Sequence, residues 1–215
     1  DDTLYMTVMF MAKYGAIFGK KEFIEESEYQ FLLHIKYLTD RNSGLWYHGW
    51  SFARGDHFAG ALWARGNSWI TACVPDYLEI VEVSPAAKRI IVGAYTRQLE
   101  TLVKLQAESG LWHTLLNDET SYEESSASAN FAYGIMKGVR LGLLDKKYNE
   151  CAYKAINALY GCVDENGTVD KCSYGTGMGE TLEFYKEIPI CPMPYGQTLS
   201  ILAFIEYIKS NETER

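Results

Sequence analysis

Apolar side chains recur every three or four positions through most of this chain, and short glycine-rich segments separate the long periodic ones. This spacing is typical of helices that bury one face, whereas half-buried strands would alternate apolar and polar positions. The segments expected to be helical are 2–15, 22–39, 67–83, 85–108, 126–142, 146–162 and 195–210. Strand signals are confined to the segments between them, so the sequence predicts an all-α protein.

The expected helices differ in how they should pack. The first is apolar on most faces, which predicts an inner helix with neighbours on several sides, and Gly15 or Gly19 is suited to end it. The second carries Glu and Lys between its apolar positions, which predicts an outer helix. Ser84 followed by Pro85 has the pattern of a helix start, while Pro75 inside the third expected helix predicts a kink.

A short repeat joins these helices. Ser43–Trp46 reads Ser-Gly-Leu-Trp, the same four residues recur at Ser109–Trp112, and a fainter copy stands at 166–169. Each copy follows a pair of helices, and a repeated connector with a period of about 60 residues is typical of stacked αα units. Such units would curl into an (α/α)6 toroid with the connectors at one mouth. A full ring needs roughly 350 residues, so we expect residues 1–215 to form a single domain, a partial barrel of about seven helices without the ring's N-terminal helices.

Composition and charge exclude some partners. The net charge of −8 argues against nucleic acid, which requires a basic surface. No apolar run approaches the ~20 residues needed to cross a bilayer, so no membrane partner is expected. The five cysteines are odd in number and lack the spacing of zinc or redox sites, which favours free, mostly buried thiols in a reducing compartment.

Four of the five tryptophans lie between positions 46 and 69, in a segment punctuated by glycine. His48 and Arg65 lie among them. Indole faces stack on the C–H faces of sugars, and planar donors bind hydroxyls and carboxylates, so the cluster indicates a sugar site. In the alternative interpretation the tryptophans only close helix ends, and Arg65 is a surface charge that covers Trp63.

Carboxylates supply the candidates for acid–base chemistry. Asp1 and Asp2 stand at the head of the apolar first helix, where burial would favour a protonated, proton-donating carboxyl; the alternative is a plain helix cap. The pairs Asp56–His57 and Glu123–Glu124 are interpreted as solvated loop charges. The glycine-rich segment 175–179 does not follow a strand, so it predicts a flexible connector instead of a phosphate loop.

Several motifs together resemble glycoside hydrolase family 105, the unsaturated rhamnogalacturonyl hydrolases. They occur in the family's order at Asp2–Met6, His48–Trp50, Trp63–Trp69 and Glu124–Ala129, followed by the final helix from Pro194. The resemblance covers nearly the whole chain, and its Trp-x-Arg-Gly-Asn-x-Trp element is the most specific part. We expect the chain to correspond to the family's C-terminal part.

The resemblance implies hydrolysis of pectin-derived oligosaccharides that end in a 4,5-unsaturated uronic acid. By motif match, Asp2 stands where the family keeps its acid/base aspartate, and His48, Trp63, Arg65 and Trp69 stand where it binds the unsaturated sugar. His48 would hydrogen-bond near the reacting ring, Arg65 would contact a polar group or carboxylate, and the tryptophans would stack. The resemblance implies no metal, no organic cofactor and a cytoplasmic location.

Two other functions stay open. A truncated half-toroid would serve as a non-catalytic sugar-binding or assembly module, and its apolar inner helices would then require cover, for example from a second copy in a homodimer. The other is a different activity of the α/α-toroid fold, such as sugar epimerisation, for which the sequence offers no clear histidine pair.

Overall fold

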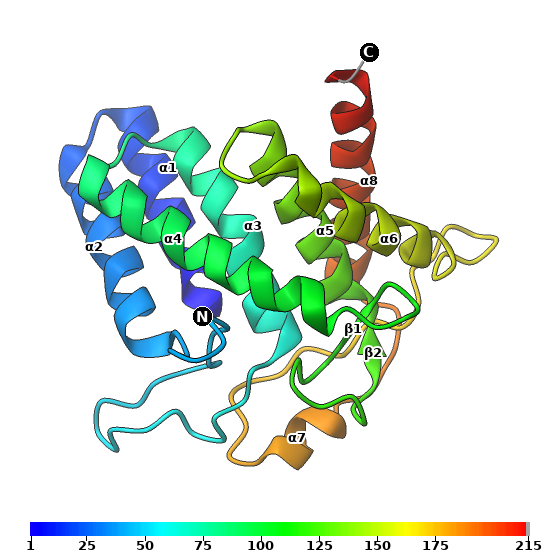
Figure 1. Cartoon of the computed structure of the whole chain (residues 1–215). Helices are drawn as coiled ribbons and strands as arrows, with labels where there is room; N and C mark the ends of the chain where they lie inside the picture. Colours follow the sequence, from blue (N-terminus) through cyan, green and yellow to red (C-terminus); the bar gives the residue numbers. More distant parts are fainter. Residues whose placement is uncertain (214–215) are drawn as a thin grey trace.

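Helices supply nearly all the regular structure in the computed structural model, which describes residues 1–213 (Figure 1). A π-helical turn, Leu4–Val8, leads directly into the first α-helix. The α-helices are α1 (Met9–Phe18), α2 (Lys21–Leu38), α3 (Ala64–Ile80), α4 (Pro85–Leu102), α5 (Ser125–Arg140), α6 (Asn149–Tyr160), α7 (Leu182–Lys186) and α8 (Pro194–Thr213). Short 3-10 turns lie at Val103–Leu105 and Lys146–Tyr148, and β1 (Trp112–His113) pairs antiparallel with β2 (Glu123–Glu124).

The helices form two rows. Helices α1, α3, α5 and α8 pack side by side in the inner row, while α2, α4 and α6 cover them from outside (Figure 1). The approach of α3 to α5 is close because Gly134 has no side chain, and a Cβ there would overlap the carbonyl oxygen of Thr71. The alternation of inner and outer helices confirms the predicted all-α architecture of the toroid type, and seven of the α-helices have ten or more residues.

The helix ends follow the local sequence signals in most places. Gly19 ends α1 in the left-handed conformation (φ 63°), and the Ser84 side chain accepts a hydrogen bond from the third residue of the helix that Pro85 begins. Pro75 lies inside α3. Helix α7 was not predicted, since its five residues are too few to show a helical period.

The prediction for the first helix needs a correction. Leu4, Val8 and Ala12 are buried, but Phe10 is 71% exposed and Ile17 66% exposed. Its apolar residues therefore occupy two faces, of which only one packs on α3 and α2. The described residues leave the other face open.

The two copies of the repeat are built alike. Gly44 and Gly110 adopt positive φ angles (77° and 98°), and the Leu and Trp that follow each glycine are buried. The backbone N–H of Trp46 donates to Asn67 of α3 (2.8 Å), and that of Trp112 donates to Ser128 of α5 (3.0 Å). Each connector is thus fixed to the first turns of the inner helix that follows it. The connectors and α7 gather at the end where the N-terminus lies (Figure 1).

The cysteines, which all lie in the described part of the chain, form no disulfide bonds. Four of the five cysteines are buried and Cys191 is partly exposed, and all are free, as predicted. Within residues 1–213, none of the helices combines the length and the apolar composition that crossing a bilayer requires.

Candidate functional site

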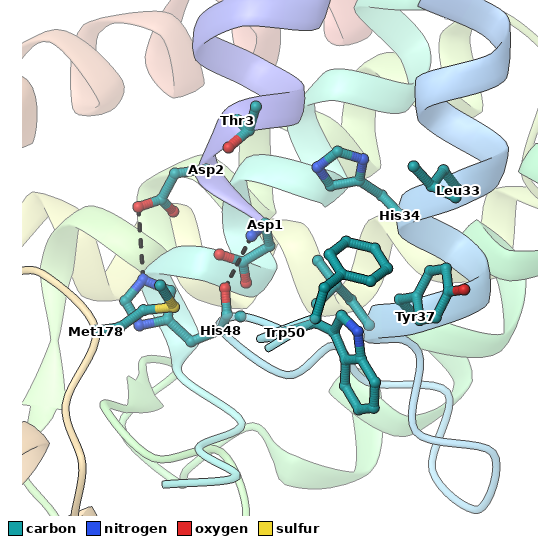
Figure 2. Close-up of a pocket in the computed structure, with 12 residues that line it drawn as sticks. Asp1, Asp2, Thr3, Leu33, His34, Tyr37, His48, Trp50 and Met178 are labelled. Carbon is teal, nitrogen blue, oxygen red and sulfur yellow. Dashed lines mark hydrogen bonds and ion pairs between the residues drawn. The ribbon is translucent and has the colours of Figure 1, made fainter. Parts of the chain in front are cut away.

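A cavity of about 290 Å³ lies where the start of the first helix meets the connector that follows α2 and the glycine-rich segment 175–179 (Figure 2). One side carries the carboxylates and a histidine, and the other is largely aromatic and aliphatic. The lining residues are Asp1, Asp2, Thr3, Leu33, His34, Tyr37, Leu38, His48, Gly49, Trp50, Phe52 and Met178. They come from the start of the first helix, the second half of α2, the first connector and the glycine-rich segment.

Asp2 and His48 face each other across the polar side of this cavity (Figure 2). Oδ2 of Asp2 lies 3.6 Å from Nε2 of His48, within the range of an ion pair but longer than a hydrogen bond. The Asp2 side chain is 38% exposed, whereas that of His48 is only 6% exposed. The carboxyl group can therefore meet both water and a ligand, while the imidazole is held in place by the protein.

Contacts with several parts of the chain hold His48 in position. Its backbone N–H donates to Ala61 (3.1 Å), and its imidazole lies 4.5 Å from the indole of Trp63. Its Nδ1 lies 2.6 Å from Oη of Tyr185, a residue of α7 that is 1% exposed. Burial raises the pKa of Tyr185, so its hydroxyl stays protonated at neutral pH.

Asp1 has an unusual environment. Both of its carboxylate oxygens are buried without a hydrogen-bond partner, and the group lies against Gly66, where a Cβ would overlap it. Asp1, Asp2 and His48 each offer one ligand atom within 4.8 Å of the others. We assign no metal to them, because a buried carboxylate beside an acid and an imidazole equally suits proton transfer.

Arg65 lies behind the cavity and is not one of its lining residues. Its guanidinium donates to the carbonyl oxygens of Ser173 (2.7 Å) and Tyr174 (2.9 Å), and Nη1 lies 3.9 Å from the carboxylate of Glu124. The group also lies over the indole of Trp63, 4.5 Å from the ring centre. Arg65 thus fixes the start of the glycine-rich segment to α3.

The prediction for Glu124 was wrong. It was expected to be a solvated loop charge, but it is 1% exposed. Its carboxylate accepts hydrogen bonds from the backbone N–H groups of Ala127 (2.5 Å) and Ser173 (2.9 Å). It therefore caps α5 and holds the same connector that Arg65 holds.

The predicted site residues fall into two groups. Asp2 and His48 line the cavity, and Trp63 packs directly on His48. Trp69 lies outside the lining and packs on Tyr5, with ring centres 4.9 Å apart. Trp63 and Trp69 are 2% and 7% exposed, so both belong to the buried frame of the site.

An aromatic wall, made of Tyr37, Trp50 and Phe52, lines the other side of the cavity: Trp50 belongs to the predicted tryptophan cluster, whereas Tyr37 and Phe52 were not predicted. The ring of Tyr37 lies 5.5 Å from that of Trp50 and 4.9 Å from that of Phe52. Phe52 is 70% exposed and lines the cavity, so its ring is open to a ligand. Asp56 and His57 lie beside this wall but outside the cavity lining: Asp56 pairs with Arg54.

Met178 and Tyr185 were also not predicted from the sequence. They join the site from more than 120 residues along the chain, so no local spacing relates them to His48. The density of glycine around 175–179 was the one available signal, and it was interpreted as a connector.

Comparisons with known proteins identify the family of the chain. Residues 1–211 match the family described as Glycosyl Hydrolase Family 88. The chain is 34% identical over 212 residues to the unsaturated rhamnogalacturonyl hydrolase YesR of Bacillus subtilis, an alignment that covers 98% of this chain and 60% of YesR.

Two solved structures are similar over nearly the whole chain. A possible member of the GH105 family from Salmonella enterica is 46% identical with a TM-score of 0.96, and one from Klebsiella pneumoniae is 45% identical with a TM-score of 0.95. Each alignment covers 98% of this chain and 56% of the other, so the chain spans little more than half of their length. These matches confirm the resemblance that the motifs indicated, and the chain belongs to Glycosyl Hydrolase Family 88.

Proposed function

We propose that the protein is a hydrolase that removes a terminal 4,5-unsaturated uronic acid from pectin-derived, rhamnogalacturonan-type oligosaccharides. The observation that carries the proposal is the Asp2 carboxyl group, which faces His48 in a cavity with an aromatic wall. The similarity to YesR, an unsaturated rhamnogalacturonyl hydrolase, supports the substrate class.

In this proposal Asp2 acts as both acid and base. Its carboxylic acid gives a proton to C4 of the enol ether, the adjacent C5 becomes electron-poor, and water adds there. The Asp2 carboxylate then takes the proton that the water loses, which restores the acid. The product at C5 is a hemiketal, which opens and releases the neighbouring sugar. Asp2 is suited to both steps because its side chain is partly open to solvent.

The other predicted residues receive roles according to where they lie. His48 contacts the reacting ring and the Asp2 carboxylate, because it is the residue of this group that shares the cavity with Asp2. Trp63, Arg65 and Trp69 support binding from behind: Trp63 packs on His48, Arg65 holds the connector that carries Met178, and Trp69 packs on Tyr5 of the π-helical turn.

The test is a direct assay with an unsaturated galacturonyl disaccharide. Hydration removes the conjugated double bond, so activity is measured as loss of ultraviolet absorbance. The Asp2→Asn variant should lower the rate by about 10²- to 10⁴-fold. Asp164→Asn is the matched control, because Asp164 lies in a distant connector and should leave the rate unchanged. Near-normal turnover by Asp2→Asn would remove Asp2 from the mechanism.

A non-catalytic assembly role is the second candidate, and exposed apolar side chains favour it. Met6, Phe10 and Ile17 on the first helix, and Ile201 and Ile208 on α8, are each more than 45% exposed. These two faces lie at opposite ends of the inner row, where a second copy of the chain could cover them. Light scattering tests the homodimer, since a monomer at high concentration would contradict it.

The location follows from the same proposal. An enzyme for short unsaturated oligosaccharides acts after the polymer has been cut and imported, and the five free thiols suit a reducing compartment. We therefore place the activity in pectin degradation in the cytoplasm. Fractionation of the source cells, with activity in the soluble or the exported fraction, tests this placement.

A further inference from the structure

Four groups form a chain from the glycine-rich connector to the Asp2 carboxylate. The backbone N–H of Gly179 donates to Oη of Tyr185 (3.0 Å). The same oxygen lies 2.6 Å from Nδ1 of His48, and Nε2 on the far side of that imidazole lies 3.6 Å from Oδ2 of Asp2. Nothing in the proposed mechanism uses Tyr185, although it is the closest side-chain partner of His48.

The other hydrogen bond of Tyr185 determines whether its hydroxyl or Nδ1 of His48 is the donor between them. The Tyr185 oxygen already accepts the N–H of Gly179, and its own hydrogen requires an acceptor because the side chain is buried. Nδ1 of His48 is the acceptor within reach. A neutral imidazole that accepts at Nδ1 carries its hydrogen on Nε2.

We propose that Tyr185 is a positioning residue: by donating to Nδ1 it holds His48 in the tautomer that presents its Nε2–H to Asp2. The catalytic consequence rests on the proposed function, whereas the tautomer does not. When Asp2 has given its proton to the substrate, the Nε2–H group stabilises the carboxylate that remains. The opposite tautomer would turn a lone pair toward that negative charge.

The surroundings of Tyr185 hold its hydroxyl in one direction. The next residue, Lys186, forms an ion pair with Asp118 (2.7 Å), and the Tyr185 ring lies 5.9 Å from that of Trp63. The hydroxyl of Tyr122 donates to the backbone carbonyl of Tyr185 (3.3 Å). Helix α7 therefore presents a single phenol to His48, and the link through Gly179 makes this contact depend on the connector that carries Met178.

Nitrogen-15 NMR of the histidine side chains tests the tautomer without a substrate. Spectra are recorded at a pH of about 9, well above the ordinary histidine pKa, and His48→Gln identifies the His48 signals. The wild-type protein should show an unprotonated Nδ1 and a protonated Nε2. A protonated Nδ1 in the wild type would overturn the proposal by itself, whatever the variants do.

The Tyr185→Phe variant supplies the second readout. It keeps the ring but lacks the donor, so the His48 signals should shift toward a mixture of both tautomers. Tyr160→Phe is the control, because it removes an exposed phenol on α6 that takes no part in these contacts, and its spectrum should match the wild type. Unchanged His48 signals in Tyr185→Phe would contradict the proposal.

Kinetics separate this proposal from the proposed function. With the unsaturated disaccharide, Tyr185→Phe should lower kcat by about 10- to 100-fold with little change in KM, as for other partners that fix a histidine tautomer. The predicted spectra together with an inactive wild type would overturn the proposed function alone. A raised KM with an unchanged kcat would show that Tyr185 only holds the connector, and would overturn the catalytic part of the proposal.

Discussion

Gly49 and Met178 are in such close contact that no side chain fits between them: a Cβ on Gly49 would overlap the sulfur of Met178. Gly49 directly follows His48, and Met178 lines the same cavity (Figure 2). The missing side chain at position 49 therefore lets the Met178 thioether lie against the backbone next to His48.

Replacing Gly49 with alanine should displace Met178 and weaken substrate binding. The added methyl group overlaps the thioether of a flexible side chain that is 47% exposed, so Met178 can move aside at little cost in folding stability, but its place in the cavity lining changes. We expect KM for the unsaturated disaccharide to rise by about tenfold. Gly177→Ala is the control in the same connector, since a Cβ there meets no atom within 4 Å.

A double variant shows whether the overlap is the cause. Truncating Met178 to alanine in the Gly49→Ala background removes the obstructed atoms, so KM should return toward the value of Met178→Ala alone. If the two changes instead add independently, Gly49 acts through the backbone of His48 and not through Met178.

The aromatic wall should contribute to substrate binding more than to chemistry. Phe52→Ala removes a ring that is 70% exposed beside the cavity, while the Asp2–His48 pair stays intact. A stacking contact of about 1 kcal/mol predicts a KM about fivefold higher with kcat nearly unchanged. Tyr160→Ala, on α6 and 78% exposed, is the control for loss of a surface aromatic ring. Equal KM values for the two variants would show that the wall does not touch the substrate.

The architecture could be predicted because its signals are local. The Ser-Gly-Leu-Trp repeat requires a glycine with positive φ and a buried Trp in each copy, and both Gly44 and Gly110 meet that requirement. Even the faint third copy is built on the same plan, since the backbone N–H of Val169 donates to Gln197 of α8 (3.1 Å). The repeated connector therefore predicted the helix pairs, although each copy is short.

The site could be predicted only as far as sequence motifs reach. Asp2 and His48 belong to motifs and both line the cavity, whereas Met178 and Tyr185 reach it through the fold. Arg65 stays a predicted substrate contact, but it does not line this cavity, and its hydrogen-bond partners lie more than 100 residues along the chain. No spacing within the sequence distinguishes an arginine that binds a ligand from one that holds a loop.

Thiol reactivity should follow burial. Burial raises the pKa of Cys151 and of Cys172 to about 12, so these thiols hold almost no reactive thiolate near neutral pH. At pH ~8 a disulfide reagent such as Ellman's should titrate Cys191 first, because it is the partly exposed thiol of the five. Raising the pH should speed this reaction as more thiolate forms.

A variant and the unfolded protein test whether Cys191 is the thiol that reacts first. Cys191→Ser should abolish the fast phase, and all the remaining thiols should react once the protein is unfolded in denaturant. A fast phase that survives in Cys191→Ser would mean that one of the buried thiols is accessible through local opening.

Loss of Arg65 should lower the stability of the folded protein more than it changes the cavity, because Arg65 does not line the cavity. Arg65→Met removes the donors to Ser173 and Tyr174 and leaves the buried Glu124 carboxylate without its cation, a change that costs about 3 kcal/mol. Denaturant unfolding should therefore show a clearly lower midpoint. Arg54→Met is the matched control, because Arg54 pairs with Glu180 at the exposed side of the same connector, and its midpoint should stay near the wild type. Wild-type stability with a raised KM would instead return Arg65 to the substrate.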